Sequence, residues 1–211
     1  MAGHPGQGQT WGGAATYING PVGLAAGFLH IENGSSRAVA ADGSGGWTSP
    51  TATGLDTSNN PIVGGYATAK SINIAQAAGQ YVLGPVTLGL GYSFSQYRPD
   101  AQSNFTSTER FHTGRAFANY QVTPSLLLGL GYAYTNASGD TDAKYHQASV
   151  GADYSLSKRT DVYLIGAYQH ASGTQRTASG GTQVAEASIG SYGYAGTRSQ
   201  ELVALGLRHK F

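Results

Sequence analysis

Apolar and small polar residues alternate with a period of two along most of the chain. In the stretch 86–95, VTLGLGYSFS, every second side chain is apolar, and Thr, Gly or Ser fills the positions between. The stretch 126–135, LLLGLGYAYT, has a similar order, and both stretches begin aliphatic and end aromatic on the apolar side. A period of two is typical of β-strands with two unlike faces. Glycines interrupt the helical i, i+3, i+4 pattern nearly everywhere, so the sequence predicts an all-β protein.

This alternation predicts nine strands, most of them about 10–14 residues long, whereas strands of globular proteins usually have roughly 5–6 residues. A strand that crosses a bilayer at a tilt needs about 9–11 residues. The predicted lengths therefore favour a sheet that spans a membrane. The predicted strands are 9–18, 21–32, 69–83, 86–97, 110–122, 125–135, 144–156, 160–170 and 200–211.

Short and long connections alternate between these strands. The short turns fall at 19–20, 84–85, 123–124 and 157–159, and the long connections at 33–68, 98–109, 136–143 and 171–199. The two ends of a soluble β-sandwich are chemically alike and give no reason for such an order. Barrels of the bacterial outer membrane have tight periplasmic turns and longer external loops. The order therefore predicts an antiparallel transmembrane β-barrel.

The composition argues against a soluble β protein such as a lectin or a jelly roll. Charged residues make up 11% of the chain, against about 25% in ordinary soluble domains. The polar face of the predicted strands carries Gly, Ser, Thr, Ala and Gln, where a face in contact with water would carry more Lys, Glu and Asp. Twelve basic and eleven acidic residues leave a net charge of +1, so no basic face indicates nucleic-acid binding.

No motif predicts catalysis, a cofactor or a metal centre. The chain has no cysteine, no nucleophile elbow and no phosphate-binding loop, and the spacing of its six histidines is not that of metal ligands. The run 136–142, NASGDTD, resembles a fragment of a calcium-binding loop but lacks the closing glutamate. We interpret it as part of a solvated external loop, with contact to a divalent cation as the weaker alternative.

The last predicted strand ends on an aromatic residue. Its alternating residues form an outward series: Val203, Leu205, Leu207, His209 and Phe211. This series resembles the C-terminal insertion signal of Gram-negative outer-membrane barrels, which the barrel-assembly machinery reads.

Three stretches are similar to the general trimeric outer-membrane porins of Gram-negative bacteria, of the betaproteobacterial type. They are YINGPVGLAAGF at 17–28, LSKRTDVYLIGAYQHASG at 156–173 and GLRHKF at 206–211. Such porins have sixteen strands, so the resemblance implies that residues 1–211 form one domain, the C-terminal portion of a barrel, with strands eight to sixteen. A signal peptide, seven earlier strands and the inward-folded constriction loop have no counterpart in the sequence. The resemblance also implies an outer-membrane location, contact with lipopolysaccharide and a homotrimer.

The predicted function is a water-filled channel for passive diffusion of small hydrophilic solutes and ions. Charges on the face opposite the apolar stripe are expected to line the lumen, with Arg115 at mid-strand and the others near the periplasmic mouth: Arg115, Asp153, Asp161, Arg208 and Lys210. Tyrosines near strand ends are expected to form interfacial belts: Tyr17, Tyr81, Tyr120, Tyr132, Tyr134, Tyr154 and Tyr168. The alternative is a barrel that acts as an anchor, an adhesin or an autotransporter translocator.

Overall fold

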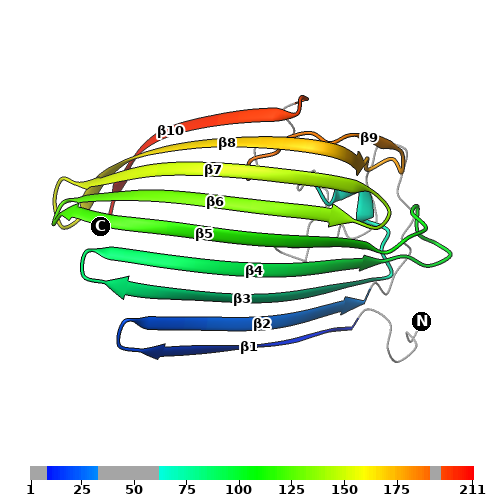
Figure 1. Ribbon diagram of the computed structural model, residues 1–211, viewed down its shortest axis with the longest axis horizontal. Coiled ribbons are helices and arrows are strands. Elements are labelled where there is room, and N and C mark those ends of the chain that lie inside the picture. Colours follow the sequence, from blue (N-terminus) through cyan, green and yellow to red (C-terminus); the bar gives the residue numbers. More distant parts are fainter. Residues whose placement is uncertain (1–8, 33–61, 191–195) are drawn as a thin grey trace.

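The computed structural model describes residues 9–32, 62–190 and 196–211, and these residues form an almost entirely β structure (Figure 1). One short 3-10 helix, η2, spans Gly64–Tyr66. The strands are β1 (Thr10–Asn19), β2 (Val22–Glu32), β3 (Ser71–Leu83), β4 (Val86–Arg98), β5 (Glu109–Thr123), β6 (Leu126–Ser138), β7 (Asp142–Ser155), β8 (Thr160–Arg176), β9 (Thr182–Val184) and β10 (Ser199–His209). The nine predicted strands are confirmed, and β9 is an addition to them.

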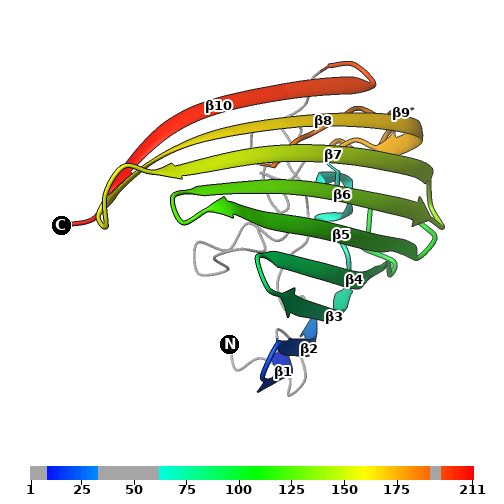
Figure 2. The same ribbon diagram turned by 60° about the vertical axis from the view of Figure 1, so that its left-hand side comes forward.

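Nine long strands form one antiparallel sheet in the order β1-β2-β3-β4-β5-β6-β7-β8-β10, and β9 pairs with the last residues of β8. Figure 2 shows that this sheet is strongly curved, as a portion of a barrel is. Within the described residues β1 and β10 form its two edges and do not pair with each other. Both edge strands run from the end with the long connections, the loop end, to the end with the short connections, the turn end.

The turn end is built as the sequence predicts. The β1–β2 and β3–β4 connections each contain a Gly-Pro pair, and Gly20 and Gly84 both have φ of +55°. Glycine adopts this left-handed conformation at little steric cost. Two-residue connections of this kind keep consecutive strands in antiparallel register.

The prediction of a long loop at 136–143 is wrong. β6 continues to Ser138 and β7 begins at Asp142, so three residues connect them. Backbone pairing persists although the residues are polar, and Ser138 lies opposite Asp142. The tight turn contains Gly139 at φ +133°. β8 likewise extends to Arg176, six residues beyond its predicted end at 170. Polar composition was therefore a poor guide to strand ends, because hydrogen bonding between the strands decides where they stop.

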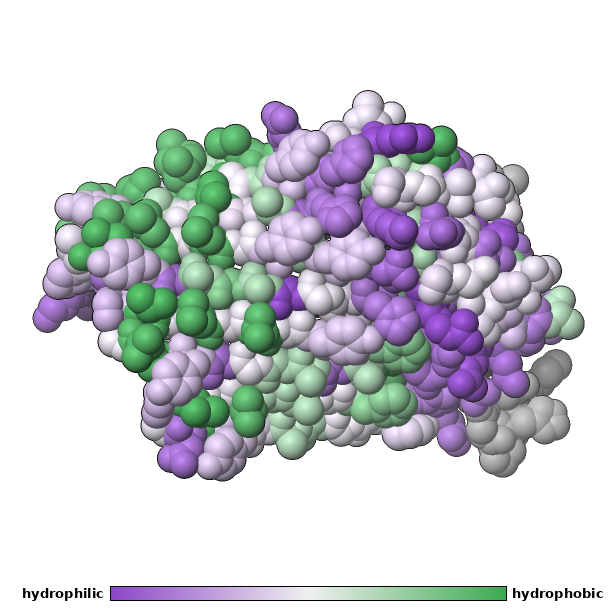
Figure 3. Space-filling model, viewed as in Figure 1, coloured by the Kyte–Doolittle hydropathy of each residue, from purple (hydrophilic) through white to green (hydrophobic). Residues whose placement is uncertain are grey.

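The strand register separates two unlike faces. Gly79, Leu90, Ala116 and Tyr132 lie opposite one another on the outer, convex face, and the adjacent positions face the concave side. Large apolar side chains are exposed along the outer face, among them Leu90 at 71% and Val203 at 79%. Figure 3 shows these hydrophobic residues toward the turn end of the strands and hydrophilic residues toward the loop end.

A hydrophobic cluster fills the concave side at the loop end. Tyr66 of η2 packs against Phe105 and Phe111, with ring centroids 5.1 and 5.9 Å away. Its hydroxyl hydrogen-bonds with the Thr141 hydroxyl at 3.0 Å, and burial raises the pKa of Tyr66 above its usual value. The buried members of the cluster are Ile31, Tyr66, Ala69, Ile72, Tyr97, Phe105, Phe111, Ala137, Ala143, Tyr145, Ala171, Ala185 and Ala187. The segments 62–69 and 185–189 thus fold against the inner wall.

Polar contacts also join the strand connections at the loop end. The Arg176 guanidinium pairs with Asp140 at 2.5 Å and donates to the backbone carbonyl oxygens of Asn104 and Gly180 at 2.9 and 2.6 Å. Buried Glu109 accepts the backbone N–H groups of Asp140 and Thr141. The Asp140 carboxylate, which the sequence left open as a cation contact, thus pairs with Arg176. In the described part of the chain, no group of three or more acidic, His or Cys residues could hold a metal ion.

Glutamine side chains of the inner wall hold the second segment. Each accepts a backbone N–H through its side-chain oxygen: Gln175 from Glu186 at 3.0 Å, Gln169 from Ser188 at 2.6 Å and Gln200 from Ile189 at 2.5 Å. Among the described residues no helix is long and apolar enough to cross a membrane.

The β6–β7 turn should depend on glycine at position 139. A Cβ atom there would overlap the carbonyl oxygen of Thr108, and φ is positive. We expect Gly139→Ala to lower the free energy of unfolding by about 1–3 kcal/mol, measured by thermal unfolding in detergent micelles. Gly13→Ala is the control, because nothing lies within 4 Å of its added Cβ. Equal unfolding temperatures for the two variants would contradict the strained turn.

Candidate functional site

Arg115 is the charged residue nearest the middle of the concave face. It lies on β5, opposite Gly91 of β4 and Ala133 of β6. Its side chain passes over Gly91, where an added Cβ would be 3.0 Å from the Arg115 Cγ. Its Nη2 reaches the Ser93 hydroxyl at a long 3.5 Å. No carboxylate among the described residues forms an ion pair with this exposed guanidinium.

The wall around Arg115 carries no other charge and consists mainly of small and neutral polar side chains, with Ile18 and Phe117 as its large apolar members. Two open hollows of about 260 and 280 Å³ lie on the concave side beside this residue. Their inward-facing lining residues include Thr16, Ala25, Gln76, Ala78, Gln80 and Gly91. Such a surface leaves room for water and carries no fixed negative charge near the guanidinium.

The turn end of the concave face holds a three-residue ion cluster. Arg208 of β10 donates through Nε to Asp161 Oδ1 at 3.0 Å, and its Nη2 lies 2.9 Å from Asp161 Oδ2. The same Nη2 is 3.3 Å from Asp153 Oδ2 on β7. Two carboxylates against one guanidinium leave a net negative charge. The cluster joins three neighbouring strands, including the last.

The structure thus separates the five charged residues predicted to line a lumen. Asp153, Asp161 and Arg208 come together at the turn end, and Arg115 stands alone at mid-wall. Lys210 follows the end of β10, and its backbone N–H donates to the Arg159 carbonyl at 2.8 Å. The clustering could not be predicted from sequence, because it depends on the register of β10 with β8.

The seven tyrosines expected to form interfacial belts lie on the outer face of the sheet, in two groups. Tyr17, Tyr81, Tyr120 and Tyr154 are near the turn end, and Tyr132, Tyr134 and Tyr168 are nearer the loop end. The sequence analysis did not predict that histidines on the same face form hydrogen bonds with tyrosines. Tyr92 bonds His112 at 2.6 Å and Tyr132 bonds His146 at 2.7 Å. Their even-numbered positions, in phase with the apolar residues of β5 and β7, were the signal that could have identified them.

In β10 the residues of the C-terminal series lie on the outer face of the sheet. Val203, Leu205 and Leu207 are 79%, 74% and 65% exposed. The next member, His209, hydrogen-bonds the Thr160 hydroxyl at 2.9 Å, and its ring lies 5.0 Å from that of Phe211. Phe211 follows the end of β10 and is fully exposed.

A curved antiparallel sheet with an apolar outer face and a small-residue inner face is the architecture of a membrane barrel wall. The sequence matches the Gram-negative porin family over residues 1–174. The chain belongs to this family. Two solved structures share the fold of this porin. The anion-selective porin from Comamonas acidovorans aligns with a TM-score of 0.63 and 19% identity over 96% of this chain and 49% of that chain.

The second is OmpT, an outer membrane protein of Vibrio cholerae, with a TM-score of 0.59 and 17% identity over 93% of this chain and 53% of that chain. The porin therefore spans about half the length of either structure. No curated protein sequence matches it. The predicted porin family, membrane barrel fold and outer-membrane location are confirmed.

Phe211 provides a test of the C-terminal series. In a closed barrel that contains this chain, we expect deletion of Phe211 to lower sharply the amount of folded porin in the outer membrane, because an interfacial aromatic ring at the end of the outward series is lost. Phe211→Tyr retains a ring and should assemble normally. Heat-modifiable migration of outer-membrane fractions on gels measures both. A deletion variant that accumulates at the parental level would make Phe211 a passive chain end.

Proposed function

We propose that this porin forms part of the wall of a water-filled channel, through which small hydrophilic solutes and ions diffuse passively across the outer membrane. The observation that carries the proposal is the guanidinium of Arg115, which forms no ion pair among the described residues and stands on a wall of uncharged, mostly small side chains. In a lumen such a group acts on passing ions through its charge alone. Porins are typically channels without a catalytic step, and the proposal involves none.

Closure of the channel requires further strands. β1 and β10 run in the same direction, so an antiparallel barrel closes only through an odd number of additional strands between them. Seven such strands would give the sixteen of a general porin. Closure also satisfies the backbone groups of both edges, each of which costs several kcal/mol in hydrocarbon when unpaired. For the complete barrel we propose a homotrimer, insertion by the barrel-assembly machinery and contact with lipopolysaccharide.

We further propose that the channel prefers anions. Arg115 has no neighbouring carboxylate, whereas Arg208 is offset by Asp153 and Asp161. The electrostatic potential near Arg115, at the middle of the wall, is therefore positive. The related structure from Comamonas acidovorans is named an anion-selective porin, which agrees with this sign.

The segments 62–69 and 185–189 contribute to size selection in this proposal. They pack on the concave side at the loop end, which faces outside when the short turns are periplasmic. Solutes would pass these segments before they reach Arg115. The alternative function as an anchor, an adhesin or a translocator has no observation among the described residues in its favour.

Reversal of the charge at position 115 tests both the channel and its preference for anions. In a closed barrel that contains this chain, we expect Arg115→Glu to shift the zero-current potential toward cations. The anion-to-cation permeability ratio should fall about fivefold or more, because the swap changes the Coulomb energy of a passing ion by roughly 1 kcal/mol at ~7 Å in water.

Planar-bilayer recording in a salt gradient measures this shift, and low salt enlarges it because screening is weaker. Lys144→Glu, an equal charge change on the outer face of β7, is the control. No discrete conductance from the unmodified barrel would overturn the channel. An unchanged potential in Arg115→Glu would remove Arg115 from the pore wall.

A further inference from the structure

The concave face has a hollow of about 770 Å³ at its turn end, over β6, β7 and β8. A glycine pair forms its floor, because Gly129 of β6 lies directly opposite Gly151 of β7. An added Cβ at Gly151 would meet only the Leu164 carbonyl oxygen, at 3.8 Å, so the space above this glycine is open. Arg115 does not border the hollow, which is therefore separate from the middle of the wall.

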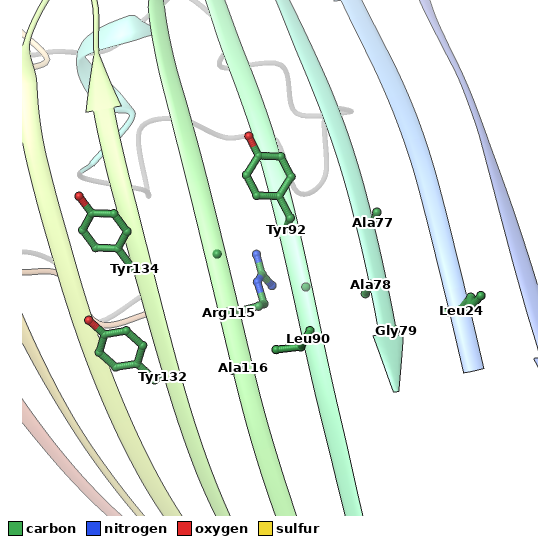
Figure 4. Close-up of a pocket in the computed structure, with 12 residues that line it drawn as sticks. Leu24, Ala77, Ala78, Gly79, Leu90, Tyr92, Arg115, Ala116, Tyr132 and Tyr134 are labelled. Atoms are coloured by element: carbon green, nitrogen blue, oxygen red, sulfur yellow. The ribbon is translucent and has the colours of Figure 1, made fainter. Parts of the chain in front are cut away.

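Another hollow, of about 660 Å³, lies on the outer face (Figure 4). Leu90, Tyr92 and Tyr132 border it. In an outer-membrane porin that face meets lipid. The inner hollow instead faces the channel of the proposed function, so a molecule that binds there comes from water.

Apolar side chains stand exposed on the inner hollow. Leu127 and Ile165 are 36% and 41% exposed, although they face the concave side. Tyr163 also borders the hollow, and its ring covers Gly206 of β10, where an added Cβ would overlap it. An exposed apolar patch on a wall that otherwise suits water marks a binding surface.

Polar groups with spare hydrogen-bonding capacity border the same hollow. Asp153 of β7 lies opposite Tyr163. Its Oδ2 is 3.3 Å from Nη2 of Arg208, whereas its Oδ1 accepts no hydrogen bond within the described residues. The Asn119 Oδ1 lies over Gly129, 3.0 Å from the position of an added Cβ, and its carboxamide has no hydrogen-bond partner in the described part of the chain. A carboxylate that accepts and a carboxamide that both donates and accepts thus face one open space.

We propose that this hollow, the turn-end solute site, binds a neutral sugar of one or two rings on its passage through the channel. The C–H groups of a sugar ring pack on Tyr163 and Ile165, since the face of an aromatic ring is negative and attracts them. Its hydroxyls donate to Asp153 and exchange hydrogen bonds with Asn119. Small-molecule sites combine an apolar lining with a few polar groups that fix orientation. The proposal rests on the proposed function and adds a solute class to it.

The charges and the lining together favour a neutral sugar over other solutes. Asp153 and Asp161 against Arg208 leave a net negative charge, which repels an anion. A small inorganic cation would leave the apolar side chains exposed to water. A purely apolar molecule would cover Asn119 and Asp153 without satisfying their hydrogen bonds, which is costly.

The test is ion-current recording in planar bilayers from a closed barrel that contains this chain, with glucose or sucrose added. We expect a saturable reduction of the current, whereas viscosity alone gives a linear one that is equal in all variants. Tyr163→Ala and Asn119→Ala should each raise the half-saturating sugar concentration about fivefold, through lost ring packing and a lost hydrogen bond. Gly151→Val should abolish saturation because it fills the hollow. Glucuronate, an anionic counterpart of glucose, should bind about fivefold or more weakly, because it is repelled by the carboxylates.

Two variants elsewhere on the concave face are matched controls. The Phe117 ring covers Gly89 as Tyr163 covers Gly206, but Phe117 does not border the hollow. Gly27→Val adds the same side chain as Gly151→Val, and its added Cβ would meet nothing nearer than 3.5 Å. Phe117→Ala and Gly27→Val should both keep the half-saturating concentration of the unmodified barrel. Heat-modifiable migration confirms that each variant is folded.

Saturation-transfer NMR with the same barrels in detergent detects sugar binding without any current. A barrel that conducts ions but shows neither saturable reduction nor NMR contact would overturn the site and leave the channel intact. Without conductance from the unmodified barrel the channel fails, and the NMR contact with its loss in Tyr163→Ala then decides the site alone. Equal binding of glucuronate and glucose, or unaltered binding in both Tyr163→Ala and Asn119→Ala, would also overturn the assignment.

Discussion

The rest of the structure depends on the continuous antiparallel hydrogen-bond ladder. Hydrocarbon offers no partner to a backbone N–H or carbonyl group, so a chain that spans a membrane as a sheet must pair every strand with its neighbours. The ladder fixes which residues stand side by side, and the pleat sends alternate residues to opposite faces. Gly91 comes to lie beneath Arg115, and Asp161 beside Arg208, because the register leaves no other arrangement. The chemistry of both surfaces follows from this single constraint.

The same constraint explains what sequence reasoning could predict. Alternation along 86–95 and 126–135 revealed the strands and their outward phase, because a period of two persists wherever the two faces differ. Arg115 could be assigned to the inner face from parity alone. Strand ends were less predictable, since Ser138 and Arg176 are polar residues that remain in the ladder.

The local sequence pattern could not predict contacts between segments that are far apart in the chain. Nothing near Tyr66 in the sequence indicates that it packs against Phe105 and Phe111 on the inner wall. The 136–142 run was interpreted as part of a solvated external loop, with contact to a divalent cation as the weaker alternative, yet its Asp140 pairs with the guanidinium of Arg176 from β8. The hydrogen bond between Tyr92 and His112 was not predicted, because the two residues lie on different strands, although both occupy outward-facing positions.

The fastening at the loop end has a consequence for motion. Arg176 simultaneously contacts the turn that contains Asp140, the β4–β5 connection at Asn104 and the backbone at Gly180. Displacement of any one of these connections breaks contacts that hold the other two. One side chain thus couples three connections that are far apart in the sequence, and loss of the Arg176 guanidinium would loosen all three together.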